Sequence, residues 1–249
     1  MLFLVLYYVL TIILCVLGLI ACKKYIKTDR VKHLVFKIVA IVTVILHYSI
    51  LWVEYLQNGK VEVPNSLLFP IYPCHIVMWI ALITALWKNK NSNVFQFLVI
   101  FMFFIGTICS SIGIVFNENY LSSPSDVDYE VVKGLLSHST LLFCCLYVFV
   151  MGYLKVNFIN NIIGVIMGLL LLLVQGTIIN TLFKICGIDS VNAMYLQEPP
   201  FESLPFINTL TIGVLGVIVS FVWVLILEYF FVPKEQRFFI KLKEKRGKK

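Results

Sequence analysis

A cysteine and a histidine are the residues of this sequence best suited to carry out chemistry. Cys74 follows Pro70 and Pro73 in an otherwise apolar stretch over residues 64–87. Proline disrupts a helix interior but suits a first turn, so we expect a helix that begins at Pro73 and carries Cys74 in that turn. Unpaired N–H groups and the helix dipole favour a thiolate there. The alternative is that Cys74 only fills space as a small apolar residue.

His138 is the partner that we expect for Cys74. It follows the polar stretch 117–133 and enters the next apolar stretch within about one turn. An imidazole can take the thiol proton, the thiolate can attack a carbonyl, and the imidazolium can then protonate the leaving group. His75 directly follows Cys74 but lies about 100° further round the helix, so we expect it to be a poor partner for that thiol.

The composition is that of an integral membrane protein. The chain has 249 residues, of which 60% are hydrophobic and 13% charged, and its mean hydropathy is +0.95. A soluble domain has roughly half apolar and roughly a quarter charged residues. The seven cysteines do not form pairs of CxxC spacings, so the sequence predicts neither a disulfide framework nor a zinc site. We expect no metal and no other cofactor.

Seven stretches are long and apolar enough to cross a bilayer, which takes about 20 residues of helix. We therefore expect an all-α, polytopic membrane protein that forms a single seven-helix domain over residues 1–249. The expected spans are about 2–21, 34–56, 70–87, 94–116, 134–154, 162–183 and 208–231. The first could also be a signal peptide, but its basic residues follow the apolar run, so we expect a retained helix.

The basic residues predict the orientation. If the N-terminus lies outside, the cytoplasmic segments 22–37, 88–93, 155–161 and 232–249 hold 17 Lys and Arg residues, and the opposite side holds three, Lys60, Lys133 and Lys184. Cytoplasmic loops are the ones enriched in Lys and Arg. We expect a multi-pass protein of a bacterial plasma membrane with a cytoplasmic C-terminus. The basic tail 232–249 either lies on anionic lipid or serves only as a topology signal.

Further polar residues within or beside the spans could form a substrate pocket. His47 and Glu54 lie seven residues apart, which places them on one helix face, and Gln175 lies in mid-span. The last outer loop holds Asn192 and Tyr195, whose amide and phenol could donate hydrogen bonds to a substrate or to an oxyanion. Ordinary turn chemistry with interfacial aromatic residues would explain that loop equally well.

Four motifs in order resemble those of the YwaF-like integral membrane proteins, over roughly residues 35–230. They are Pro70 with Cys74, Phe104-Ile105-Gly106, the helix opening at His138, and Asn192-x-Met194-Tyr195-Leu196 followed by Pro199. This bacterial family is related to a eukaryotic transmembrane acyltransferase that acts on ether phospholipids. The resemblance implies acyl transfer through a cysteine and a histidine, which correspond to Cys74 and His138.

Two positions depart from the pattern of that family. Tyr72 stands where many relatives carry a histidine, two residues before the cysteine, and Ala193 follows Asn192 where an aromatic residue is usual. We place Tyr72 among the expected substrate-binding residues, with His47, Glu54, Gln175, Asn192 and Tyr195.

The sequence leaves more than one function open. The first is a lipid acyltransferase or lipid hydrolase at the outer face, with Cys74 as nucleophile and His138 as base. The alternative is a protein that binds or transports a lipid or a small metabolite in a polar intramembrane pocket. A third is a structural partner that associates through small residues such as Gly164 and Gly168. Membrane lipids are the expected partners, and nucleic acid is not expected.

Overall fold

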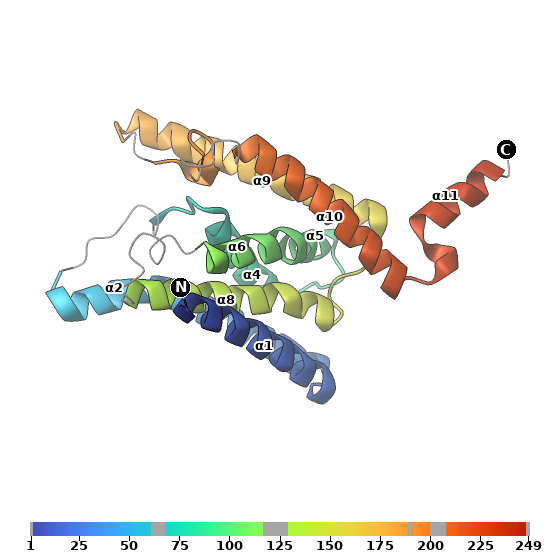
Figure 1. Ribbon diagram of the computed structural model, residues 1–249, viewed down its shortest axis with the longest axis horizontal. Coiled ribbons are helices and arrows are strands. Elements are labelled where there is room, and N and C mark those ends of the chain that lie inside the picture. The colour runs from blue at the N-terminus through green and yellow to red at the C-terminus, as the bar shows by residue number, and fades with distance from the viewer. Residues whose placement is uncertain (1, 61–67, 117–128, 189–190, 200–207, 248–249) are drawn as a thin grey trace. The chain divides into compact units, whose positions relative to one another are not determined.

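A computed structural model describes residues 2–60, 68–116, 129–188, 191–199 and 208–247 (Figure 1). Every regular element in these residues is a helix, as the sequence predicts. The chain forms two compact units, Met1–Tyr153 and Leu154–Lys249, each of which is described on its own. Their union in one domain stays a prediction.

The first unit contains six α-helices and one π-helical segment among the described residues. They are α1 (Leu2–Tyr25), α2 (Asp29–Asn58), α4 (Pro73–Leu86), α5 (Asn93–Phe101), η1 (Met102–Gly106), α6 (Thr107–Val115) and α8 (Tyr129–Val150). Local chemistry sets the ends of α2: the Thr28 hydroxyl accepts from Val31 N–H, and Gly59 takes a left-handed conformation with φ 66°.

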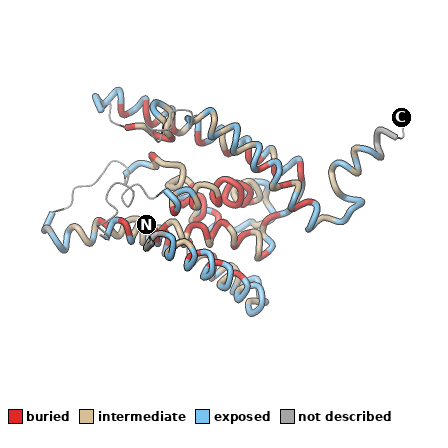
Figure 2. The backbone as a smooth tube through the Cα atoms, in the orientation of Figure 1, coloured by how far each residue is buried: buried red, intermediate tan, exposed pale blue. Residues whose placement is uncertain are grey.

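The continuous helix formed by α5, η1 and α6 lies in the core of the first unit. Phe101, Met102 and Phe104 are completely buried, and Figure 2 shows the buried residues gathered along these helices and the neighbouring part of α8. Helix α8 contacts α1, α2, α4, η1 and α6. The π-helical turn inserts one extra residue into the span, which rotates the face that α6 presents relative to α5.

The second unit is a helix pair with two short additions. Helices α9 (Phe158–Ile185) and α10 (Thr209–Phe231) contact each other, and the 3₁₀ turn η2 (Ala193–Tyr195) contacts α9. After a second 3₁₀ turn, η3 (Lys234–Gln236), comes α11 (Phe238–Gly247). The ring of Phe158 stacks on that of Phe238 with 4.6 Å between centroids, so the basic C-terminal helix is held to the start of α9.

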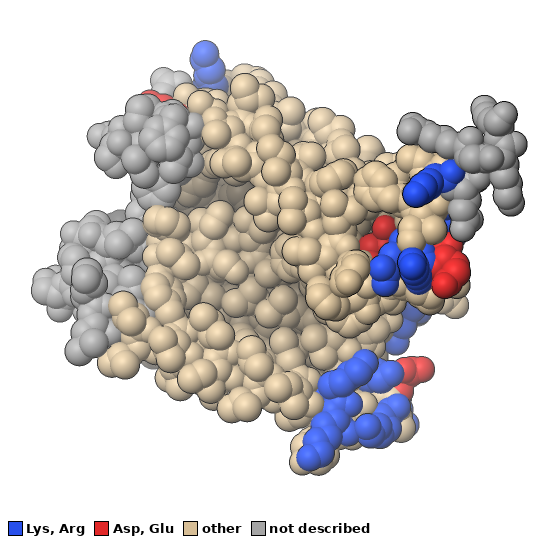
Figure 3. Space-filling model, turned by 45° about the vertical axis from the view of Figure 1, so that its right-hand side comes forward, with Lys and Arg blue, Asp and Glu red and all other residues tan. Residues whose placement is uncertain are grey.

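The chain is a multi-pass membrane protein. Six helical stretches of the described residues are long and apolar enough to span a bilayer, and α4 is a shorter apolar helix of 14 residues. At about 1.5 Å per residue, α4 is shorter than a hydrocarbon core of about 30 Å. The helix is therefore shorter than the span expected over residues 70–87, because it begins at Pro73 and ends at Leu86. In the face shown in Figure 3, the broad central area carries no charged side chain, as a lipid-facing surface requires.

Candidate functional site

Cys74 lies in the first turn of α4, as the proline spacing predicts. The helix begins at Pro73, and the preceding residue, Tyr72, has an extended backbone and gives no side-chain cap. The thiol of Cys74 is free and half-buried. The first turn therefore has N–H groups without a capping side chain, beside a thiol that could use them.

A second cysteine, Cys109 on α6, lies close to Cys74. Helices α4 and α6 are in contact, and the two thiols are near enough to interact electrostatically. Cys109 is also free and half-buried. Cys74 thus adjoins the face of α6 that carries Cys109.

The ring of His138 packs directly against the backbone of α6 at Gly113. A Cβ atom added to Gly113 would lie 2.4 Å from Cε1 and 2.5 Å from Nδ1 of His138. Any side chain at this position would therefore displace the imidazole. Gly113 follows Cys109 by four residues, which places both on one face of α6 one turn apart. Cys74 and His138 accordingly adjoin the same face of α6.

No hydrogen bond joins Cys74 to His138 in the described part of the chain, where Nδ1 of His138 is buried without a hydrogen-bond partner. Catalytic hydrogen bonds are often long or absent before a substrate binds. The thiol of α4 and the imidazole of α8 thus lie against neighbouring positions on one face of α6. A ring nitrogen of the imidazole is available to accept a proton.

Two other histidines lie beside this pair. The rings of His47 on α2 and His75 on α4 are 4.5 Å apart between centroids, and Tyr72 meets His75 edge-on at 5.3 Å. His138 interacts electrostatically with both His47 and His75. The structure therefore brings three imidazoles from three helices together, and His75 faces His47 instead of serving as a bystander next to Cys74.

Tyrosine hydroxyls hold the helices at this level. Tyr8 donates to the carbonyl of Ile114 at 2.7 Å, one residue after Gly113. Tyr7 shares a hydrogen bond with Ser139 at 2.7 Å, one residue after His138. These bonds fasten α1 to α6 and α8 where the imidazole meets the glycine, which restricts how far the two helices can separate.

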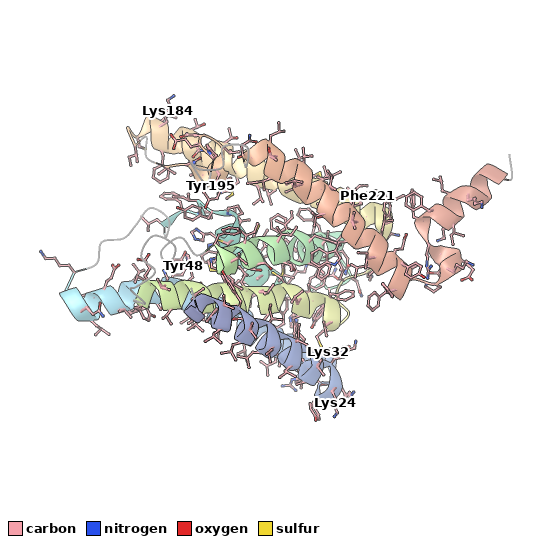
Figure 4. The ribbon with its side chains drawn as sticks, viewed as in Figure 1. Lys24, Lys32, Tyr48, Lys184, Tyr195 and Phe221 are labelled. Carbon is pink, nitrogen blue, oxygen red and sulfur yellow. The ribbon has the colours of Figure 1, made fainter. Side chains whose placement is uncertain are left out.

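A further bond fixes the opposite side of the cluster. Tyr129, at the start of α8, donates to Ser49 on α2 at 2.6 Å. Ser49 lies two residues after His47, so α2 and α8 are tied together close to the histidines. Figure 4 shows Lys24 and Lys32 at one end of this unit and Tyr48, which follows His47, toward the other. Tyr48, and with it the neighbouring His47, thus lies away from the basic ends of α1 and α2.

Lys133 and Glu54 are further ionisable residues on the helices that carry these histidines. Lys133, on α8, interacts electrostatically with His47, His75 and His138. Glu54 lies two turns beyond His47 on α2 and is half-buried. Among the described residues, no group of His, Cys, Asp and Glu side chains has the arrangement of a metal site.

The remaining predicted substrate residues belong to the second unit. Gln175 lies on α9 directly before Gly176. The backbone of Gly176 is so close to Met194 that a Cβ atom added to the glycine would lie 2.8 Å from Cγ of Met194. Met194 and Tyr195 have positive φ angles of 56° and 55°, an uncommon conformation for residues other than glycine. Hydrogen bonds therefore have to hold this turn in place.

Asparagine side chains supply those bonds. Asn180 binds the backbone of Ala193 twice, donating to its carbonyl at 3.2 Å and accepting from its N–H at 2.7 Å. Asn192 donates to the carbonyl of Glu198 at 2.9 Å and accepts from Gln197 N–H at 3.0 Å. The amide of Asn192 thus forms a turn. Its predicted substrate contact, like that of Tyr195, stays a prediction.

The sequence predicted Cys74, His138 and His47 as site residues, and this stays a prediction. It did not point to Cys109 or Gly113, and it set His75 aside as a partner for Cys74. The spacing of four between Cys109 and Gly113 is a signal that could have pointed to one shared face of α6. No pattern in the sequence tells that this face meets α4 and α8. Parts of the two stretches that we expect on the outer side, 117–133 and 184–207, lie outside the described residues. They are residues 117–128, 189–190 and 200–207.

The comparison with known families agrees with a transmembrane architecture. No curated protein and no solved structure matches the chain. A model of the TMEM164 family matches residues 1–227, which include Cys74, the three clustered histidines and the Asn192 turn. Since this match covers most of the sequence, the chain belongs to the TMEM164 family.

Proposed function

We propose that this protein is a membrane-embedded lipid acyltransferase or lipid hydrolase with Cys74 as nucleophile and His138 as base. The observation that carries the proposal is that both residues adjoin one face of α6, Cys74 near Cys109 and His138 on Gly113. The resemblance to the YwaF-like family, which is related to an ether-phospholipid acyltransferase, supports the same chemistry and the same two residues.

We also propose seven spans, with α4 as the third and the N-terminus outside. The distribution of Lys and Arg supports this orientation, which puts the start of α4 on the outer side. Cys74 would then meet a lipid ester at headgroup level, with the acyl chain between the helices.

The reaction would proceed in two halves. Burial favours a neutral thiol, so Cys74 is expected to pass its proton to His138 as its sulfur attacks the ester carbonyl. A C–S bond forms, the ester C–O bond breaks, and the imidazolium protonates the departing alkoxide. An alcohol or water then attacks the thioester, gives its proton to His138, and the thiolate leaves and is reprotonated. Uncapped N–H groups in the first turn of α4 could stabilise the intermediate oxyanion.

An acyl-mimetic, thiol-reactive probe on the purified full-length protein tests the nucleophile. We expect Cys74→Ser to abolish labelling and the matched variant Cys109→Ser, which changes a neighbouring half-buried thiol, to keep it. Equal labelling of Cys74→Ser and the unaltered protein would end the proposal.

The base is tested by His138→Gln. We expect its labelling rate by the same probe to fall about a hundredfold, the typical contribution of a positioned general base. His33→Gln, which changes a histidine near the other end of α2, is the control and should label at the original rate. A His138→Gln protein that labels at that rate would remove His138 from the mechanism.

The second candidate function is binding or transport of a lipid or small metabolite. The contact between His47 and His75 favours it, because two imidazoles facing each other between apolar helices make a polar site without a nucleophile. Binding or uptake that survives Cys74→Ala and is lost in His47→Ala would favour this function over catalysis.

A further inference from the structure

Two charged side chains fasten the C-terminal helix α11 to the end of α10. The carboxylate of Glu228, which is buried on α10, accepts a hydrogen bond at 3.1 Å from the N–H of Phe238, the first residue of α11. Arg237 donates to the carbonyls of Tyr229 at 2.7 Å and Val232 at 3.1 Å, at the C-terminal end of α10. A negative charge at the start of one helix and a positive charge at the end of another both suit the helix dipoles. These bonds therefore stabilise the junction of the two helices.

Aromatic rings pack around the same junction. Phe158, at the start of α9, stacks on Phe238 and meets the ring of Phe239 edge-on with 5.6 Å between centroids. The guanidinium group of Arg237 lies 4.7 Å from the centroid of the Tyr229 ring. Helix α11 therefore starts beside the end of α10 and the start of α9. Figure 1 shows that it turns away from the line of α10 instead of continuing it.

Exposed aromatic residues indicate where the membrane surface meets this junction. Tyr229, Phe230 and Phe231 are exposed on the last turn of α10, a helix long and apolar enough to span a bilayer. Phe239 on α11 is exposed as well. Tyrosine is enriched at the boundary between membrane and water, and helices that lie in this boundary insert phenylalanine and leucine into it. Helix α11 therefore begins at the level of the lipid headgroups.

Basic residues follow these aromatic residues directly. Residues 238–249 contain six Lys and Arg residues and one acidic residue, Glu244. The side chains of Lys241 and Lys243 are exposed, and neither forms an ion pair with a side chain that the structure describes. A negatively charged lipid surface attracts such a cluster. The exposed rings beside the lysines favour a lipid surface over a soluble acidic partner.

We propose that α11 is a membrane-surface helix whose lysines bind the headgroups of anionic lipids, with Glu228 and Arg237 as its anchor. The basic tail is then more than a topology signal. It recognises the net negative charge of the leaflet on the side of the C-terminus and does not bind a substrate for Cys74. The role of α11 is therefore independent of the proposed acyl transfer, and loss of Cys74 labelling or its retention does not bear on it.

Hydrogen–deuterium exchange of the purified full-length protein in lipid nanodiscs tests this role. One set of discs contains phosphatidylcholine alone, and the other contains phosphatidylcholine and the anionic phosphatidylglycerol in equal amounts. A helix of 10 residues is marginally stable in water by itself, so contact with charged lipid should protect its amides. We expect the amides of residues 238–247 to exchange about tenfold more slowly in the anionic discs, and this difference to shrink in concentrated salt.

Two double variants of α11 test whether the lysines make the lipid contact. Lys241→Gln with Lys243→Gln should lose most of the difference between the two kinds of disc. The matched control, Lys241→Arg with Lys243→Arg, retains both positive charges and should keep the difference. The segment 191–199, which Asn180 holds near the other end of α9, is the internal control and should exchange equally in both discs.

Equal exchange of residues 238–247 in the two kinds of disc would overturn the proposal and leave the tail as a topology signal. A difference that survives unchanged in the glutamine variant would also overturn it, because the lysines would then not contact the lipid. Glu228→Ala tests the anchor, since it leaves Phe238 N–H without its carboxylate partner. This variant should exchange faster in the first turn of α11 in both discs, and unchanged exchange would remove Glu228 from the anchor.

Discussion

At the scale of single residues, the missing side chain of Gly113 decides where the imidazole of His138 lies. The ring occupies the space that a Cβ atom would fill, with three of its atoms within 2.7 Å of that position. A real Cβ contact is never that short, so either the ring or the helix has to move if a side chain is added. The glycine therefore gives His138 its place on α6.

Gly113→Ala is expected to impair the site without unfolding the protein. The methyl group forces the His138 ring away from α6, and a displacement of about 1 Å in a catalytic group can cost about a hundredfold in rate. We expect thiol labelling of Cys74 to fall at least about tenfold, with a stability cost of about 1–3 kcal/mol from overpacking. Labelling kinetics and thermal unfolding measure the two effects.

Gly213→Ala on α10 is the control for this substitution. A Cβ atom there meets nothing within 4 Å, so labelling should stay unchanged. The unfolding temperature should not fall and should rise slightly, because alanine favours a helix interior over glycine. If Gly113→Ala labels as fast as Gly213→Ala, the position of the His138 ring does not matter for the reactivity of Cys74.

At the scale of elements, close backbone contacts assemble the helices around the site. A Cβ added to Gly106, the last residue of the π-helical turn, would lie 2.6 Å from Cys145 Sγ and 2.7 Å from Val77 Cγ1. The turn can therefore approach both α8 and α4. Because one extra residue in this turn rotates the following helix, η1 also sets which face of α6 carries Cys109 and Gly113 toward these neighbours.

In the second unit, the Asn180 side chain holds the turn η2 to α9. Asn180→Ala removes both hydrogen bonds to Ala193. The buried N–H of Ala193 then has no partner, whereas its carbonyl still accepts from Leu196 N–H at 3.3 Å. We expect a loss of about 1–3 kcal/mol in the stability of this turn, the cost of one buried group left unsatisfied. Faster proteolysis in the segment 191–199 of the purified protein would report this loosening.

Thr181→Ala is the neighbouring control. Its hydroxyl is exposed and donates to the Thr177 carbonyl of the same helix, so removing it should change stability by no more than about 0.5 kcal/mol. If both variants resist protease equally well, the turn is held by something other than the Asn180 amide.

At the scale of the whole molecule, charge and apolar length together determine how the chain lies in a membrane. The segments that the proposed orientation places in the cytoplasm hold 17 basic residues, and those on the opposite side hold three. The exposed faces of the long helices are aliphatic, as lipid contact requires. These two properties are distributed along the entire chain and do not depend on any one contact.

The proposed orientation predicts opposite accessibility for two exposed lysines. Lys60 follows α2 and belongs to the outer side, whereas Lys88 follows α4 and belongs to the cytoplasmic side. In intact cells, an impermeant maleimide should label Lys60→Cys above the parent protein, and Lys88→Cys only after permeabilisation. The reverse pattern would invert the orientation and place Cys74 near the cytoplasmic leaflet.

The sequence by itself determined the helical membrane architecture and the start of α4. Apolar runs of about 20 residues leave helices as the available spanning structure, and Pro73 can only begin a helix of this kind, so both follow from local chemistry. It also pointed to Cys74, because Pro73 places that residue in the first turn of a helix, and to His47 and His138, because ionisable side chains in apolar stretches are few.

Only the tertiary structure decided which of these residues meet. The pairing of His75 with His47, the packing of His138 on Gly113 and the approach of Cys109 to Cys74 each join different helices. Such contacts depend on the rotation of each helix about its axis, which here follows from the π-helical turn, from glycines that admit close approach, and from tyrosine bonds between helices. A pattern of apolar residues specifies that a helix spans the membrane. Where every face of the helix is apolar, the pattern does not specify which face turns inward.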